Sequence, residues 1–76
     1  MSYVPLALLD HFARLYATNT IPLLLHMCTP DIRDELYREY EKLMARPVAT
    51  TSEELASFNA GVLEICKKAA DDINER

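Results

Sequence analysis

Several residue types are scarce in this 76-residue chain, and each scarcity excludes a class of protein. A single glycine excludes collagen-like repeats and the glycine-rich loops that hold phosphate groups. Two cysteines are too few for a small fold held together by disulfides. Eight basic residues against twelve acidic ones give a net charge of −4, so the chain lacks the positive charge that nucleic-acid binding requires. We therefore expect no direct binding to DNA or RNA.

Long apolar runs are also missing. The longest segment without a charged residue, 15–30, is interrupted by polar residues at 18–20 and by Pro22. It falls short of the ~20 apolar residues that a membrane-spanning helix needs. Residues 1–9 contain no lysine or arginine and Asp10 follows them, a pattern unlike that of a secretory signal. We expect a cytoplasmic protein.

Apolar residues are abundant, at 50% of the chain, beside 26% charged residues. This balance is typical of chains that fold. Burial of apolar surface contributes roughly 120 kcal/mol at this length, whereas ordering the chain costs about 115 kcal/mol. Because these two quantities nearly cancel, binding to a partner or to a second copy would matter to stability. No linker or repeat divides the sequence, so we expect residues 1–76 to form a single helical domain.

The spacing of the apolar residues is helical, and the alternation typical of strands is absent. We expect an all-α fold: a compact, somewhat irregular bundle of four short helices. The first two run over about 5–17 and 21–28, with a turn of threonine and asparagine at 18–20. The third runs over about 30–45 and the fourth over about 52–73.

The last two predicted helices have clear start signals. Thr29 is expected to be the N-cap of the third helix, with Pro30 at its first position. Thr51 and Glu54 fit a capping box, in which Thr51 bonds forward and Glu54 reaches back. Gly61 falls on the polar side of the last helix, so we expect a weak point or bend there rather than close packing. A break at Gly61 would raise the count to five helices.

The first predicted helix separates its residues onto two faces. At 100° per residue, Asp10, His11 and Arg14 share a polar face, and Asp10 and Arg14 have the spacing of an ion pair. We expect that face to lie in water. The second helix is apolar nearly all round, so something must cover it. The apolar face of the first helix comprises Leu6, Leu8, Leu9, Phe12, Ala13, Leu15 and Tyr16.

The distribution of charge suggests a function. Residues 1–30 carry two of the twenty charged side chains, so their apolar surface is expected to exceed what the rest of the chain can cover. Our hypothesis is a non-enzymatic interaction module (an adaptor, inhibitor or regulator) that docks a protein through the apolar face of the first two helices, as a homodimer. The docking residues that we expect are Tyr3, Leu8, Leu23, Leu24, Met27 and Arg33.

Two of these residues carry specific expectations. Leu24→Ala should weaken partner binding without unfolding the chain. Arg33 lies within the apolar arc of the third helix, where an arginine suits the centre of an interface. The alternative for Arg33 is that it stacks on Tyr37 one turn later and reaches water.

Two other functions compete with the interaction module. The first two helices could open and insert their leucines into a membrane surface, but helices at such surfaces carry basic polar faces and no lysine precedes Lys42. Twelve acids would permit a mimic of nucleic acid, but they are interleaved with bases along the chain.

No arrangement of residues predicts an enzyme, a cofactor or a metal site. No serine lies in a sharp glycine-rich turn, and no third group accompanies the pair of His26 and Cys28. Two positions apart on a helix, these side chains would point about 200° apart, which suits a shared metal poorly. Cys28 and Cys66 are expected to be buried thiols, and one disulfide between them is the alternative.

Overall fold

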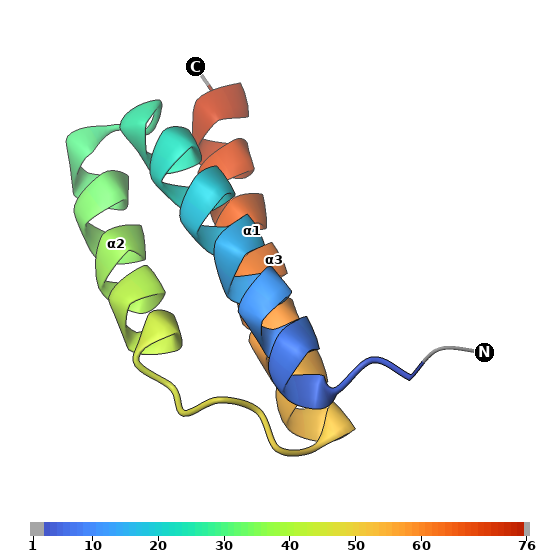
Figure 1. Cartoon of the computed structure of the whole chain (residues 1–76). Coiled ribbons are helices and arrows are strands. Elements are labelled where there is room, and N and C mark those ends of the chain that lie inside the picture. Colours follow the sequence, from blue (N-terminus) through green and yellow to red (C-terminus); the bar gives the residue numbers. More distant parts are fainter. Residues whose placement is uncertain (1–2, 76) are drawn as a thin grey trace.

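The chain folds into an elongated bundle of three helices that run up, down and up (Figure 1). The computed structural model describes residues 3–75. Within them the helices are α1 (Leu6–His26), α2 (Pro30–Met44) and α3 (Ser52–Asn74), and no strand is present. The prediction of four or five helices is wrong, because the first two expected helices are one continuous helix and α3 continues without a break through Gly61.

The helix α1 passes through the turn predicted at 18–20 and holds Pro22 in its interior. Ala17, Ile21 and Leu25 are almost fully buried and lie four residues apart, on one side of the helix. Pro22 removes one helical hydrogen bond, and threonine and asparagine favour turns. Burial of this apolar row on both sides of residues 18–20 outweighs these local preferences.

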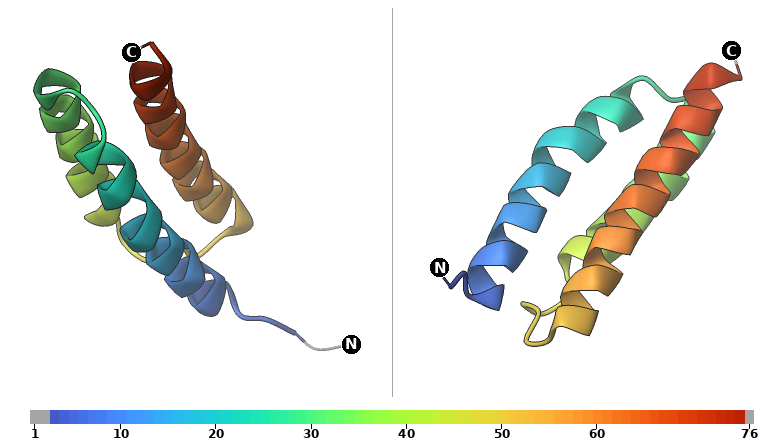
Figure 2. Two further views of the ribbon diagram at one scale, coloured as in Figure 1. Left: turned by 90° about the horizontal axis from the view of Figure 1, so that it is seen from above. Right: turned by 90° about the vertical axis from the view of Figure 1, so that its right-hand side faces the viewer.

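The core fills the space between the three helices, each of which packs against the other two (Figure 2). The helix α2 contributes Leu36 and Leu43, and it begins and ends within one residue of the predicted bounds. Cys28, at the turn between α1 and α2, is buried as well. Apolar periodicity predicts one arc of α3 that also includes Leu55, Cys66 and Ile73, and four residues of this arc are buried: Phe58, Val62, Ile65 and Ala69.

The face that α1 turns toward the core differs from the one predicted. Asp10, expected in water, is 2% exposed, whereas Leu8, Phe12 and Tyr16 lie in solvent. The predicted ion pair is confirmed, since Arg14 Nε donates to Asp10 Oδ2 at 2.6 Å. The pair, however, points into the molecule rather than into water.

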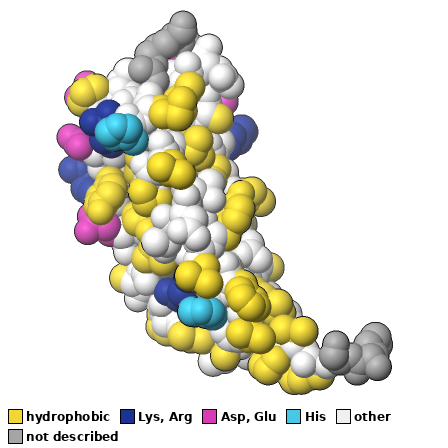
Figure 3. Space-filling view, turned by 45° about the horizontal axis from the view of Figure 1, so that its top comes forward, with side chains coloured by type: hydrophobic (Ala, Val, Ile, Leu, Met, Phe, Trp, Pro, Cys, Tyr) yellow, Lys and Arg dark blue, Asp and Glu magenta, His cyan; other side chains and the backbone are white. Residues whose placement is uncertain are grey.

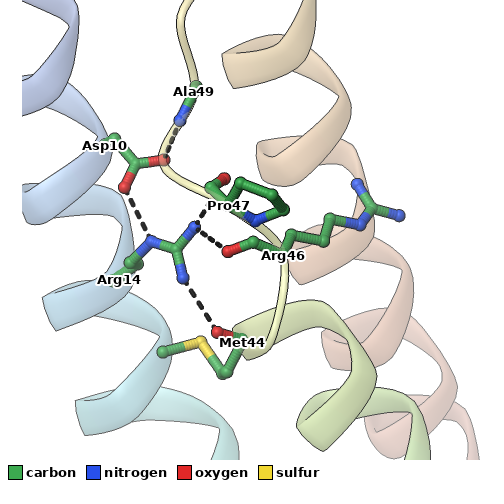
Figure 4. A network of polar contacts seen from close by, with 6 residues as sticks. All are labelled: Asp10, Arg14, Met44, Arg46, Pro47 and Ala49. Atoms are coloured by element: carbon green, nitrogen blue, oxygen red, sulfur yellow. Dashed lines mark hydrogen bonds and ion pairs between the residues drawn. The ribbon is translucent and has the colours of Figure 1, made fainter.

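A polar network explains this orientation (Figure 4). Asp10 Oδ1 accepts a hydrogen bond from the backbone N–H of Ala49 at 3.1 Å, across 39 residues of sequence. Arg14 donates at 2.9, 2.8 and 3.2 Å to the carbonyl oxygens of Met44, Arg46 and Pro47. Because these carbonyls lie at and beyond the end of α2, where helical donors run out, the network ties the α2–α3 connection to α1.

Gly61 is a packing position. A Cβ built on Gly61 would lie 2.7 Å from Cδ1 of Leu43, so α2 and α3 approach each other where the side chain is absent. The expectation of a weak point or bend at Gly61, rather than close packing, is wrong.

The predicted helix starts are found, with different hydrogen bonds. The Thr51 hydroxyl accepts from the N–H of Glu54 at 3.1 Å, as a capping box requires. The Glu54 carboxylate accepts from the N–H of Thr50 rather than that of Thr51. Thr29 is the N-cap of α2 by position, but its N–H and hydroxyl both donate to the carboxylate of Asp72. These bonds attach the α1–α2 turn to the end of α3.

Candidate interaction surface

The side of α1 opposite the core is apolar and lies in solvent. Its large side chains are 38–70% exposed, with Leu23 the most exposed of them. They lie on one side of the helix in two groups, within 8–16 and within 23–27, and Asn19 occupies the gap between Tyr16 and Leu23 on the same side. We name this set the α1 face: Leu8, Leu9, Phe12, Leu15, Tyr16, Leu23 and Met27.

The α1 face contains no charged side chain. The two charged residues of α1, Asp10 and Arg14, are held in the network on the other side of the helix. The polar side chains that share the outward side include Asn19 and His26. Figure 3 shows hydrophobic side chains along the viewed surface, with the charged ones mainly along its left edge. An exposed, largely apolar side of this kind is typical of a surface that another molecule covers.

A groove between α1 and α3 extends the α1 face sideways. Its volume is about 230 Å³, less than the volume of a site for a drug-sized ligand. Leu63 of α3 stands exposed beside Tyr16 of α1 at this groove. The groove has the size and chemistry to receive one or two apolar side chains. The residues that line it are Ala13, Tyr16, Asn59, Val62 and Leu63.

Five of the six predicted docking residues lie in three kinds of position. Leu8, Leu23 and Met27 belong to the α1 face. Tyr3 is exposed in the extended segment that precedes α1. Leu24 is half-buried and packs against the core, so Leu24→Ala would disturb the core together with any docking surface.

Arg33 bonds to the end of α1. Its Nε donates to the carbonyl oxygen of Leu25 at 2.9 Å, and one terminal nitrogen donates to those of His26 and Cys28, both at 3.0 Å. The last turn of a helix leaves such carbonyls without helical donors. Three hydrogen bonds thus engage the guanidinium within the chain, at the end of α1.

Five apolar residues of this surface are absent from the predicted docking set. Assigning 5–17 and 21–28 to separate helices hides that the α1 face lies on one side of a single helix. Once α1 is taken as one helix, the spacing of Phe12, Tyr16 and Leu23 identifies them as neighbours on one face. The residues that the prediction omits are Leu9, Phe12, Leu15, Tyr16 and Leu63.

No group of histidine, cysteine, aspartate and glutamate in residues 3–75 has a metal-binding arrangement. Both cysteines are thiols, and burial raises the pKa of the Cys66 thiol, which makes it a weaker nucleophile at neutral pH. Within the same described range, none of the three helices has the length and hydropathy needed to cross a membrane.

Comparison of the chain with models of known protein families, with curated proteins and with solved structures finds no match. The α1 face is therefore interpreted from its own chemistry and geometry.

Proposed function

We propose that this chain is a small, non-enzymatic protein-interaction module, acting as an adaptor, inhibitor or regulator, that docks a protein through the α1 face. One observation carries the proposal: the solvent side of α1, opposite the core, carries seven exposed large apolar side chains and no aspartate, glutamate, lysine or arginine. We also propose that the protein is cytoplasmic, as expected from the sequence.

Docking would follow the pattern of helix recognition. The side chains of Phe12, Tyr16 and Leu23 stand at the spacings by which helices anchor themselves to apolar surfaces. Aromatic residues are also enriched among those that contribute most to binding. The groove beside Tyr16 would receive an apolar side chain of the partner, while Asn19 and His26 would lie among the apolar contacts as polar groups.

The internal network supports this function by fixing α1 before binding. Arg14 and Asp10 hold the inner side of α1 to the α2–α3 connection, and Arg33 holds its end. A surface that is already ordered loses less conformational entropy when it binds. The α1 face is therefore a preformed docking surface rather than one that must assemble on contact.

A matched pair of variants tests the proposal. Tyr16→Lys adds a charge in the middle of the α1 face, and Tyr37→Lys adds the same charge at a similarly exposed tyrosine of α2 (57% and 47% exposed). Each variant and the parent chain are immobilised and exposed to an extract of the native host. We expect proteins that bind the parent chain and Tyr37→Lys but not Tyr16→Lys, because a desolvated lysine without a partner opposes docking. Identical binding by all three chains would contradict the proposal.

Liposome flotation tests the lipid alternative with the same variants. We expect no flotation with neutral or anionic vesicles, because α1 contains no lysine and one arginine, Arg14, which is engaged with Asp10 and three carbonyls. Flotation of the parent chain that Tyr16→Lys abolishes would replace the protein-docking proposal with a lipid-binding one.

A further inference from the structure

The spacing of residues on the outward side of α1 is the same in both directions of the helix. The intervals between six of these positions are 4, 4, 3, 4 and 4 residues. A two-fold symmetric pair of identical antiparallel helices needs this property, since each copy must present the same pattern read backwards. The six positions are Leu8, Phe12, Tyr16, Asn19, Leu23 and Met27.

Building on the proposed function, we propose that the partner at the α1 face is a second copy of this chain. Its α1 packs antiparallel to the first, about a two-fold axis between residues 17 and 18. In this register Phe12 faces Leu23 of the second copy, Leu8 faces its Met27, and Tyr16 faces its Asn19. Every contact occurs twice, once on each side of the axis.

The geometry of α1 allows this contact along its whole length. The pattern repeats every 11 residues, from Leu8 to Asn19 and from Phe12 to Leu23. An 11-residue repeat corresponds to about 3.67 residues per turn, close to the 3.6 of a straight helix, so the stripe stays on one side. From Leu8 to Met27 it spans about 28 Å at a rise of about 1.5 Å per residue.

The area of the surface matches that of a stable dimer. With about 200 Å² for each large side chain, the exposed fractions of the α1 face and Leu63 amount to on the order of 800 Å². A standard interface buries about 800 Å² on each partner. The chain exposes 5374 Å² in total, whereas a folded monomer of 8.7 kDa is expected to expose about 4,700 Å².

Charge favours a second copy at this face over other sides of the molecule. Each copy has a net charge of −4, so two copies repel each other. Residues 31–76 carry eighteen of the twenty charged side chains, and the α1 face carries none. Association through α1 keeps the charged side chains of α2 and α3 in water. The α1 face suits an apolar, uncharged helix as its partner. The outer side of α1 in a second copy is a helix surface of this kind.

Light scattering across chain concentrations, at low and high salt, tests the inference. We expect the parent chain and Tyr37→Lys to approach twice the chain mass of 8.7 kDa, with at least as much dimer at high salt, because salt screens the repulsion. Tyr16→Lys should stay at the mass of one chain while its circular dichroism remains helical. A parent chain that stays monomeric up to millimolar concentration overturns the inference.

The register is tested by cross-linking with a short bifunctional maleimide, using variants with one exposed cysteine in a Cys66→Ser background, where the remaining native thiol, Cys28, is 2% exposed. An equimolar mixture of Phe12→Cys and Leu23→Cys should give covalent dimers at least tenfold more efficiently than either variant alone, because residues 12 and 23 face each other. Efficient dimers from Phe12→Cys alone would indicate a parallel pair and would overturn the antiparallel register.

Failure of this inference can be told apart from failure of the proposed function. A monomeric parent chain that still binds host proteins through Tyr16 overturns self-association alone. A dimer that Tyr16→Lys leaves intact shows that another face associates. That result overturns the inference, and unchanged capture of host proteins by Tyr16→Lys would then overturn the proposed function as well.

Discussion

Asp10 is the residue that decides which side of α1 is buried. Its carboxylate accepts hydrogen bonds from Arg14 and from the N–H of Ala49, and the Arg14 guanidinium lies 5.0 Å from the ring centroid of Phe58. The hydrogen bond from Arg14 is the main cause that lowers the pKa of Asp10, helped by that from Ala49, although burial acts in the opposite direction. Helical periodicity uses only the polarity of each residue. It therefore predicts that the Asp10 carboxylate lies on the side of the helix that faces water.

Asp10→Asn is expected to lower the free energy of unfolding by about 2–3 kcal/mol at pH 7, because it leaves Arg14 partly buried without its ion-pair partner. The lowered pKa in the folded state means that ionised Asp10 stabilises the fold above its unfolded pKa of about 3.9. That stabilisation is lost as the pH falls through the folded pKa. Urea denaturation from pH 7 to pH 3, at one chain concentration, should therefore show a shallower acid dependence for Asp10→Asn than for the parent.

Asp34→Asn is the control, since Asp34 is an exposed acid on α2. It should change the stability at pH 7 by less than about 0.5 kcal/mol. Equal losses of unfolding free energy in Asp10→Asn and Asp34→Asn would show that the burial of Asp10 does not determine its contribution to stability.

Gly61 lies where α2 and α3 approach each other. Gly61→Ala should destabilise the chain by about 1 kcal/mol, because crowding against Leu43 exceeds the gain of about 1 kcal/mol in helix propensity. In a Leu43→Val background, which shortens the crowding side chain, the same substitution should be neutral or stabilising. Thermal unfolding of the four chains measures this difference. Stabilisation by Gly61→Ala in both backgrounds would show that α2 and α3 lie farther apart at Gly61 than in the structure.

At the scale of elements, α2 and α3 were predictable and α1 was not. The proline after Thr29, the capping pair before α3 and a charged outer face define the last two helices within a residue or two. The helix α1 has apolar residues on both sides, so periodicity alone could not choose its inner face. Its interior proline and the polar residues at 18–20 also indicate a turn. The buried row of Ala17, Ile21 and Leu25 outweighs this local signal and keeps the helix continuous.

Pro22→Ala separates the two descriptions of this segment. In a continuous α1 the substitution restores the hydrogen bond to the carbonyl of Thr18, so it should stabilise the chain by about 1–3 kcal/mol. If a new helix began at Ile21, proline would suit its first turn and the substitution would be neutral or destabilising. The midpoint of urea denaturation, at matched concentration, decides between them.

At the scale of the whole molecule, the uneven distribution of charge was the most informative feature of the sequence. It predicted that apolar surface in residues 1–30 would exceed what the rest could cover, but it could not identify that surface. The choice depends on contacts of Asp10 and Arg14 with the chain beyond residue 43, and such long-range contacts leave no local pattern. The uncharged α1 face is the surface that remains once those contacts form.

Two consecutive residues of α1, one buried and one exposed, give the most direct test of which side of the helix faces solvent. Ala17 is 0% exposed and Tyr16 is 57% exposed. We expect Ala17→Lys to abolish the cooperative thermal transition seen by circular dichroism, because it buries an unpaired charge in the core, whereas Tyr16→Lys should keep it. A folded Ala17→Lys together with an unfolded Tyr16→Lys would show that the face assigned to solvent is the core, and would contradict the docking surface.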